Sequence, residues 1–378
     1  MGGFISLLTR VWKVNNPPVS PKSPDALRFG ILGKPWTWSV AFITPAKSHS
    51  DVIVAAVASR DLARAKAPLG RSDIRRNLSR PPKRLALRVD ASSSQSRKSR
   101  PYRKPIVSNA PEAASLFNYH ASLPEASRPV LVEAFHPRFH PAWHKFISLI
   151  DPKNIERFKS NFSVSAGFFP KGNIRWDFDL AGGSLMDIGT YSVAALRDVF
   201  RAEPVECTSA QARLLPKPGD QRVDTCFDAK FKFPNGGVGR VEADLARKGW
   251  FGLPSIKMAK IVVKEKDVQI DDEARVFGPP RHIMSRTVTF WGFPAAHFWH
   301  MIQVRERHVM IDTKTDKVVE KWEGKRNMTA YVWTEGEMKG YLHWSTYRYM
   351  LDEFVCKIRR RKGTGLGLMA RTQLNRPR

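Results

Sequence analysis

The spacing of apolar residues predicts a parallel β-α-β unit near the start of the chain. Residues 27–33 and 51–58 are two nearly continuous apolar runs, which is the pattern of strands that are buried on both faces. The first run ends in a glycine turn, and the interval of about twenty residues before the second suits a crossover helix. Upstream, the i, i+3, i+4 spacing of Phe4, Leu7, Leu8, Val11 and Trp12 predicts a short amphipathic helix.

A different pattern begins at about residue 155, where short segments alternate between apolar and polar positions. Residues 224–233 and 239–245 alternate on either side of Pro-Asn-Gly-Gly, which is a strong hairpin turn. The sequence therefore predicts an antiparallel sheet after the parallel half. Further strands are expected at 129–135, 260–263, 286–291 and 308–311, and helices at 108–116 and 347–358.

These patterns divide the chain into two predicted domains of α/β and α+β class. The first, residues 1–150, contains the parallel unit, and the second, residues 151–358, contains the antiparallel sheet. Residues 67–103 disrupt the first domain, because this Arg- and Ser-rich segment has no sustained period. Residues 359–378 form an irregular basic tail.

The net charge of +28 invites a nucleic-acid-binding interpretation, but its distribution argues against one. Residues 67–104 and 359–378 together supply 17 of the 28 charges, so the rest of the chain is only modestly basic. No aromatic interleaving or helix-turn-helix pattern accompanies the charge, and we expect no nucleic-acid partner.

Cysteine usage and hydropathy indicate the compartment. Three widely spaced cysteines form neither a disulfide framework nor a metal pattern, which favours a reducing, cytoplasmic location. No apolar run reaches the roughly 18 residues of a membrane span, and no signal peptide is expected. Residues 1–6 also fit a loose N-myristoylation pattern, so acylation stays open beside docking of the first helix onto the protein itself.

The segment LAGGSLMDIGTYSVAALRDVF, residues 180–200, places two candidate chemical groups one helical turn apart. Asp187 and Tyr191 share a face roughly 120° from the apolar stripe of this predicted helix. Two interpretations remain open from these residues alone. The tyrosine packs at the edge of the stripe with its hydroxyl on the carboxylate, or the pair takes part in chemistry.

Three histidines spaced four residues apart, His136, His140 and His144, invite a metal-site interpretation. Pro137 and Pro141 interrupt the continuous helix that this spacing needs, and no HExxH glutamate is present. We therefore expect no metal, and structural or substrate-facing roles for these side chains.

The second strand is followed by Ser59 and Arg60, at the position where dinucleotide folds contact the adenosine ribose. A guanidinium binds a phosphate in bidentate fashion, so this pair favours NADP over NAD.

Three longer motifs resemble the glucose-fructose oxidoreductase and inositol dehydrogenase (Gfo/Idh/MocA) family of NAD(P)-dependent sugar oxidoreductases. The nearest branch is that of the NADP-dependent D-xylose 1-dehydrogenases and dimeric dihydrodiol dehydrogenases. The resemblance covers residues 1–66 and 104–358. It implies that residues 1–150 form a Rossmann dinucleotide-binding domain. It also implies that residues 151–358 form a domain with an open, mostly antiparallel sheet through which two copies form a homodimer. The motifs are VEAFHPRFHPAW, NIRWDFDLAGGSLMDIGTYSVAALR and PNGGVGRVEADLARKGW.

The resemblance also implies a catalytic set. The family's EKP motif matches Lys104-Pro105, with Arg103 in place of the glutamate, and its D-x-G-x-[HY] motif matches Asp187 and Tyr191. Tyr191 then acts as acid/base on a sugar hydroxyl. Because a tyrosine with a pKa of about 10 is a poor base at neutral pH, Lys104 and Asp187 would tune it.

The implied reaction is hydride transfer from the anomeric carbon of an aldopyranose such as D-xylose to C4 of NADP, which gives a lactone. The residues expected to contact the cofactor are Gly30, Gly33, Ser59, Arg60, Lys104 and Pro105. Those expected to bind sugar hydroxyls are Arg138, His140 and Arg175.

The chain departs from the family pattern in three places. Bulky residues at 34–38 replace the small ones of a tight phosphate turn, the fourth strand is missing from 67–103, and the last helix is missing after residue 358. The shift in composition favours a wrong reading frame or a missed splice junction over divergence. We therefore expect weak NADP affinity, and the alternative function is an inactive pseudoenzyme or interaction protein that retains the dimerisation sheet.

Overall fold

A computed structural model describes residues 2–32, 39–58, 107–125, 128–131, 133–249, 255, 257–270, 281–333 and 340–363. The chain divides into two compact units, Met1–Pro141 with Tyr331–Arg378, and Ala142–Ala330. The sequence grouped residues 331–358 with the second domain, whereas in the structure they pack within the first unit.

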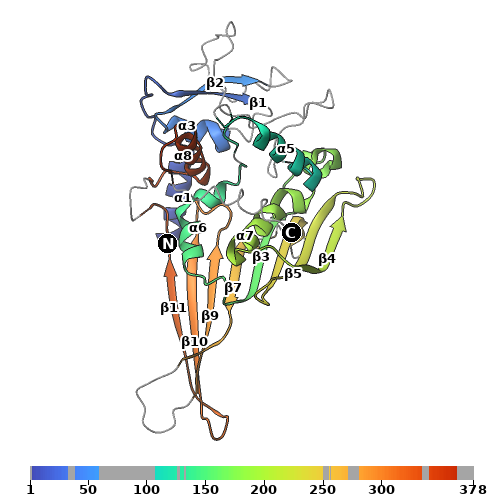
Figure 1. Cartoon of the computed structure of the whole chain (residues 1–378), viewed down its shortest axis with the longest axis vertical. Helices are drawn as coiled ribbons and strands as arrows, with labels where there is room; N and C mark the ends of the chain where they lie inside the picture. Colours follow the sequence, from blue (N-terminus) through green and yellow to red (C-terminus); the bar gives the residue numbers. More distant parts are fainter. Residues whose placement is uncertain are drawn as a thin grey trace. The chain divides into compact units, whose positions relative to one another are not determined.

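The first unit contains the predicted parallel pair of strands (Figure 1). Strand β1 (Leu27–Leu32) pairs in parallel with β2 (Val52–Ala58), which confirms the β-α-β prediction at the level of its strands. In the described residues between them, the chain forms only a π-turn, η1 (Ser39–Ile43), and a single α-turn, α3 (Thr44–Lys47).

Three longer helices complete the described part of this unit. They are α1 (Gly2–Asn15), α5 (Ala110–Ser122) and α8 (Thr346–Ile358). The predicted helices at the N-terminus, at 108–116 and at 347–358 are thus confirmed. The α5 start follows from its cap, because the Asn109 side chain accepts a hydrogen bond from the Glu112 amide at 2.9 Å. Helix α8 contributes Leu351, Phe354 and Val355 to a core shared with Phe29 and Val52.

The strand predicted at 129–135 is wrong for the described part of that run, residues 128–131 and 133–135, which form no strand. An apolar run becomes a strand only beside a partner, and no described strand pairs with this one. Phe135 already leaves the extended conformation, with φ −88° and ψ 62°, to enter the 3-10 turn η2 (His136–Phe139).

The second unit is built on a nine-stranded sheet in the order β11-β10-β9-β7-β3-β6-β5-β4, with β8 paired to β9. Within the described chain, β3 and β6 are the sheet's one parallel pair, so the predicted mostly antiparallel sheet is confirmed. The strands are β3 (Ile155–Ser165), β4 (Glu206–Leu214), β5 (Asp224–Lys232), β6 (Val238–Arg247), β7 (Lys260–Glu265), β8 (Val268–Ile270), β9 (Arg281–Trp291), β10 (Met301–Ile311) and β11 (Val318–Met328).

The two faces of this sheet differ sharply. One face, here called the core face, carries buried apolar side chains such as Phe158, Ile261 and Phe290. Helix α6 (Pro141–Ser148) covers part of it, with the Trp143 and Phe146 rings 6.3 and 5.2 Å from the Phe290 ring. Helix α7 (Thr190–Phe200) covers another part. The opposite face, here called the open face, carries polar and charged residues.

Helix length bears on membrane association. Within the described ranges, no helix combines the length and the apolar character that crossing a bilayer requires.

One buried histidine in the first unit links the fold to pH. Burial, and then the positive charge of Arg348, lowers the pKa of His49 to about 3. Its Nε2 lies 3.5 Å from the Asp352 carboxylate, a contact that would favour the charged ring. However, Arg348 binds the same carboxylate at 3.0 Å, and His49 Nδ1 accepts the Asp51 amide proton, which requires a lone pair. The ring is therefore neutral in the fold.

We predict that protonation of His49 in the unfolded chain destabilises the protein in mild acid. The unfolded ring has a pKa of about 6.5, so below that pH only the unfolded state takes up this proton. The free energy of unfolding should fall by up to about 1.4 kcal/mol per pH unit between roughly pH 6.5 and 3, with no contribution above. Urea denaturation at several pH values should show a shallower slope for His49→Asn. The control variant His120→Asn should keep the wild-type dependence of the free energy of unfolding on pH. The prediction is contradicted if His49→Asn keeps it as well.

Candidate functional site

The two glycines before Asp187 allow the chain to fold back tightly on itself. Gly182 N–H donates to the Asp177 carbonyl at 2.8 Å, and Gly183 N–H donates to the Arg175 carbonyl at 2.9 Å. A Cβ at position 182 would lie 2.6 Å from the Asp177 oxygen, and Gly183 has φ +119°. Side chains other than hydrogen do not fit at either position, so the glycine pair makes this turn.

This turn brings Arg175 against Asp187. Arg175 follows the Asn173 cap in the 3-10 turn η3 (Ile174–Trp176), and a second 3-10 turn, η4 (Phe178–Leu180), leads to the glycines. The Arg175 Nε donates to one carboxylate oxygen of Asp187, and its Nη2 lies 3.3 Å from the other. The two side chains are 20% and 18% exposed, and Phe169 stacks 4.1 Å from the guanidinium. A bidentate, largely shielded ion pair therefore fixes the orientation of the carboxylate.

Asp187 itself lies in a π-turn, η5 (Leu185–Gly189), which leads directly into α7. The Asp187 amide donates to the Gly183 carbonyl at 3.0 Å, and the Leu185 amide donates to the Asp224 carboxylate at 2.8 Å. Burial raises the pKa of Asp224 above its usual value. The start of the helix is thus held from two sides.

Tyr191 lies in the first turn of α7 and is 5% exposed. Its ring packs 6.2 Å from Phe162 of β3 and 6.3 Å, edge to face, from Phe293. The predicted apolar stripe comprises Leu185, Ile188, Leu196 and Val199; the last three are buried and Leu185 is half-buried. Phe162 and Phe293 enclose a second side of the helix, so Tyr191 is buried although it lies off the apolar stripe.

Two predicted substrate residues, Arg138 and His140, belong to the first unit. The Arg138 guanidinium lies 5.4 Å from the Phe135 ring. The His140 ring is fully buried and lies 5.4 Å from the edge of Tyr349 on α8. Pro141 is the first residue of helix α6, a position that proline tolerates in a helix. Among the described side chains, no group of three or more His, Cys, Asp or Glu is placed to hold a metal.

Most predicted cofactor contacts, namely Gly33, Ser59, Arg60, Lys104 and Pro105, lie outside the described residues. Gly30 is described, is buried in β1, and follows a shift in the β1–β2 register. The two parallel strands end at the same edge, which is where open α/β sheets bind nucleotides. This topology fits a dinucleotide.

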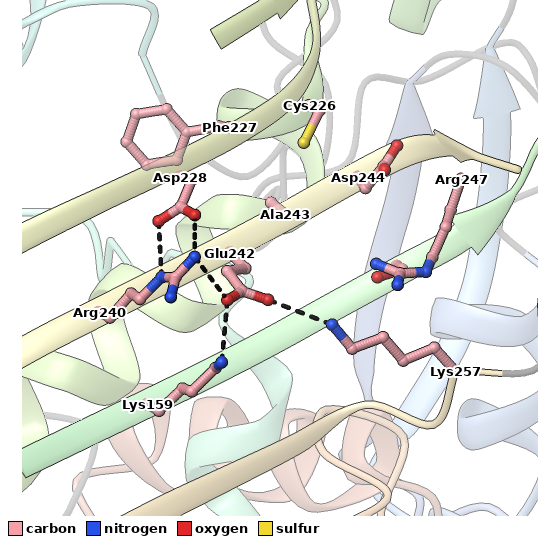
Figure 2. A pocket seen from close by; sticks show the side chains of 11 residues that line it. Lys159, Cys226, Phe227, Asp228, Arg240, Glu242, Ala243, Asp244, Arg247 and Lys257 are labelled. Atoms are coloured by element: carbon pink, nitrogen blue, oxygen red, sulfur yellow. Dashed lines mark hydrogen bonds and ion pairs between the residues drawn. The ribbon is translucent and has the colours of Figure 1, made fainter. Parts of the chain in front are cut away.

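The sequence did not single out the charges on the open face of the sheet (Figure 2). Glu242 on β6 lies 3.1 Å from Lys159, 3.2 Å from Arg240 and 3.1 Å from Lys257, around a hollow of about 360 Å³. Burial alone would raise the pKa of Glu242, but hydrogen bonds from the two lysines hold it below its usual value. The charged residues at alternate positions of β3 and β6 are the sequence signal that could have predicted this charged face.

Comparison with known proteins identifies relatives of this chain. The model of the GFO/IDH/MocA C-terminal domain matches residues 154–256. D-xylose 1-dehydrogenase (NADP(+)) 2 of Haloferax volcanii is 36% identical over 146 residues, which is 37% of this chain and 41% of the relative. The match thus spans less than half of that relative. An uncharacterized oxidoreductase, ORF334, of Rhizobium meliloti is 28% identical over 230 residues, which is 56% of this chain and 66% of the relative.

Solved structures show the same fold. KijD10, a 3-ketoreductase from Actinomadura kijaniata in complex with NADP and TDP-benzene, matches with a TM-score of 0.59 at 15% identity, covering 90% of this chain and 93% of that chain. D-galactose-1-dehydrogenase from Rhizobium etli matches with a TM-score of 0.54 at 12% identity, covering 94% and 95%. The predicted family resemblance and fold class are confirmed.

We predict that Gly182→Ala disrupts the Arg175–Asp187 turn. The new methyl group would collide with two backbone carbonyls, so stability should fall by roughly 1–3 kcal/mol, as overpacking does. Gly324→Ala is the matched control, because its Cβ would meet nothing closer than 3.9 Å. Thermal denaturation of both variants measures the difference. Equal stabilities would contradict this account of the turn.

Proposed function

Since residues 154–256 belong to the Gfo/Idh/MocA C-terminal domain family, we propose that this chain is an NADP-dependent oxidoreductase acting on a sugar. The observation that carries the proposal is the start of α7. There, Tyr191 follows by one turn an aspartate whose carboxylate is held by Arg175. An acid/base group set beside an oriented carboxylate is the arrangement that proton transfer at a sugar hydroxyl requires.

The proposed chemistry of the chain's own residues is a proton transfer. Tyr191 takes the proton of the anomeric hydroxyl while bound NADP supplies the hydride acceptor. A phenolate among aromatic rings needs a nearby cation. Arg175 is already paired with Asp187, so it is not the free cation. The proposal assigns that role to Lys104, which lies outside the described residues and whose part rests on the sequence.

NADP is favoured over NAD by Ser59 and Arg60, and it is printed in the names of the Haloferax relative and the KijD10 structure. The parallel β1–β2 pair supports a nucleotide site at its carboxyl edge. Gly30 and Gly33 would let the backbone approach the pyrophosphate, and Lys104 and Pro105 would line the nicotinamide side. The bulky residues at 34–38 predict weak affinity.

We propose D-xylose or a similar aldopyranose as the substrate, oxidised at C1 to the lactone. The name of the Haloferax relative supports this choice. Arg138 and Arg175 are the proposed partners of the sugar hydroxyls, whereas the fully buried ring of His140 favours the structural role that the sequence also allowed. All three cysteines are unpaired thiols, which favours work in a reducing compartment such as the cytoplasm.

A homodimer formed through the open face is part of the proposal. The family resemblance supports it, and so does the alternation of acids and bases on that face. Glu242 is surrounded by three cations, and Arg240 also donates to Asp228 at 2.9 Å. Such mixed charge favours specific pairing of two surfaces.

We predict that Tyr191→Phe lowers kcat for NADP reduction by D-xylose by about 100-fold or more, since the proton acceptor is lost. NADP affinity, measured by titration, should stay unchanged. Tyr119→Phe, at a side chain 66% exposed on α5, is the control and should keep full activity. Full activity of Tyr191→Phe would exclude the proposed role. A wild-type chain that reduces no NADP with any aldose would instead favour the inactive pseudoenzyme.

We predict that Glu242→Arg dissociates the dimer. The change adds a fourth positive charge beside Lys159, Arg240 and Lys257, so facing copies should repel each other. The dissociation constant should rise about tenfold or more, which is about 1.4 kcal/mol per tenfold change. Glu203→Arg removes an exposed ion pair with Arg197 away from this face and should have no effect. Sedimentation equilibrium distinguishes them. A monomeric wild-type chain, or an unchanged constant for Glu242→Arg, would contradict the proposed interface.

A further inference from the structure

Where β9 begins and β10 ends, beside β11, the sheet carries an aromatic and imidazole cluster that hydride transfer does not use. His282 on β9 and His308 on β10 are in direct contact, with His282 Nε2 2.9 Å from His308 Nδ1. Trp322 on β11 stacks on His308 with ring centroids 4.7 Å apart and planes 3° apart. The Trp322 ring also lies 5.2 Å from that of His282. The two imidazoles are therefore held in place by the tryptophan.

Two thioethers stand beside the imidazoles. Met310 is the register partner of His282, and Met284 is the register partner of His308. Residues directly opposite on antiparallel strands share a face, with Cβ atoms about 4.5–5.5 Å apart. The Cβ atoms of these four residues thus form a square on neighbouring strands, from which two imidazoles and two thioethers project on one face of the sheet. Met310 is 8% exposed, so the square is partly shielded from water.

The two hydrogen-bonded nitrogens lie close enough together to bind one metal ion as neighbouring ligands. With metal–nitrogen bonds of about 2.0–2.1 Å, a 2.9 Å separation between the two nitrogens corresponds to an angle of about 90° at the metal. That angle belongs to neighbouring ligands in a square-planar or tetragonal site, which copper(II) and nickel(II) prefer, whereas tetrahedral zinc needs a wider one. Copper(II) is the strongest binder of the series, and its reduced form favours thioethers.

We propose that His282 and His308 bind one copper ion as neighbouring ligands, with Met284 and Met310 at its flank. In the metal-free protein one imidazole donates its N–H to the other. On binding, that proton moves to the far nitrogen of the same ring, so each ring offers a lone pair to the metal. No residue of this site takes part in the proposed hydride transfer, so the two proposals fail or stand separately.

The test is copper(II) titration of the full-length, chelator-treated chain, followed by electron paramagnetic resonance. Wild type should give a tetragonal signal with coupling to two imidazole nitrogens at one equivalent of copper. His282→Gln and His308→Gln should each lose that coupling and bind copper at least about tenfold more weakly. His120→Gln should behave as wild type, because its ring lies on α5 and binds the Pro129 carbonyl at 2.7 Å. Circular dichroism verifies that each variant is folded.

Tryptophan fluorescence and competition with zinc give two further measurements of copper binding at this site. Copper should quench wild-type tryptophan fluorescence more than that of Trp322→Phe, and zinc should compete weakly. The proposal is overturned if His282→Gln binds copper as wild type does, if the signal lacks nitrogen coupling, or if zinc displaces copper at equal concentration. In each of those cases the histidine pair is a structural hydrogen bond.

Discussion

The burial of the core face of the nine-stranded sheet is the constraint on which the candidate site of the second unit depends. Ile188, Leu196 and Val199 seat α7 on this face, and the Ser160 hydroxyl of β3 donates to that of Ser192 at 2.8 Å. A Cβ at Gly239 would meet a Leu196 methyl at 2.2 Å, so the glycine on β6 lets the helix approach closely. The positions of Asp187 and Tyr191 follow from this seating, because both belong to the chain that enters α7.

Electrostatic interactions also favour the position of the Asp187 carboxylate at the start of α7. Asp187 precedes the first residue of α7, where the positive end of a helix dipole favours a carboxylate. Arg175 forms a bidentate ion pair with the same carboxylate, and the glycine turn brings the two side chains together. The result is a carboxylate that lies one helical turn before Tyr191 and whose orientation depends on a single turn of backbone. A change in that turn alters the site without touching either candidate catalytic group.

Much of the fold was predictable because its signals are local. The parallel pair is visible in two apolar runs, and the β5–β6 hairpin in Pro-Asn-Gly-Gly, where Gly236 has φ +81°. Strand β4 was not predicted, because its apolar positions are mostly small residues, all nine of its positions are exposed, and Thr208-Ser209 breaks its alternation of polar and apolar residues. The strand expected at 129–135 lacks a described partner, and partnership is a long-range property. Likewise, the pairing of Arg175 with Asp187 depends on a tight turn that spacing alone does not reveal.

The two faces of the sheet divide the proposed functions between them. The core face positions the acid/base group, and the open face offers charges to a second copy. The central claim is that hydride leaves C1 of the sugar. Its most direct test is incubation of the chain with NADP and D-xylose deuterated at C1, followed by mass spectrometry of the nucleotide. The account predicts deuterium at C4 of NADPH. Reduced nucleotide without deuterium, or no reduced nucleotide at saturating NADP, would contradict it.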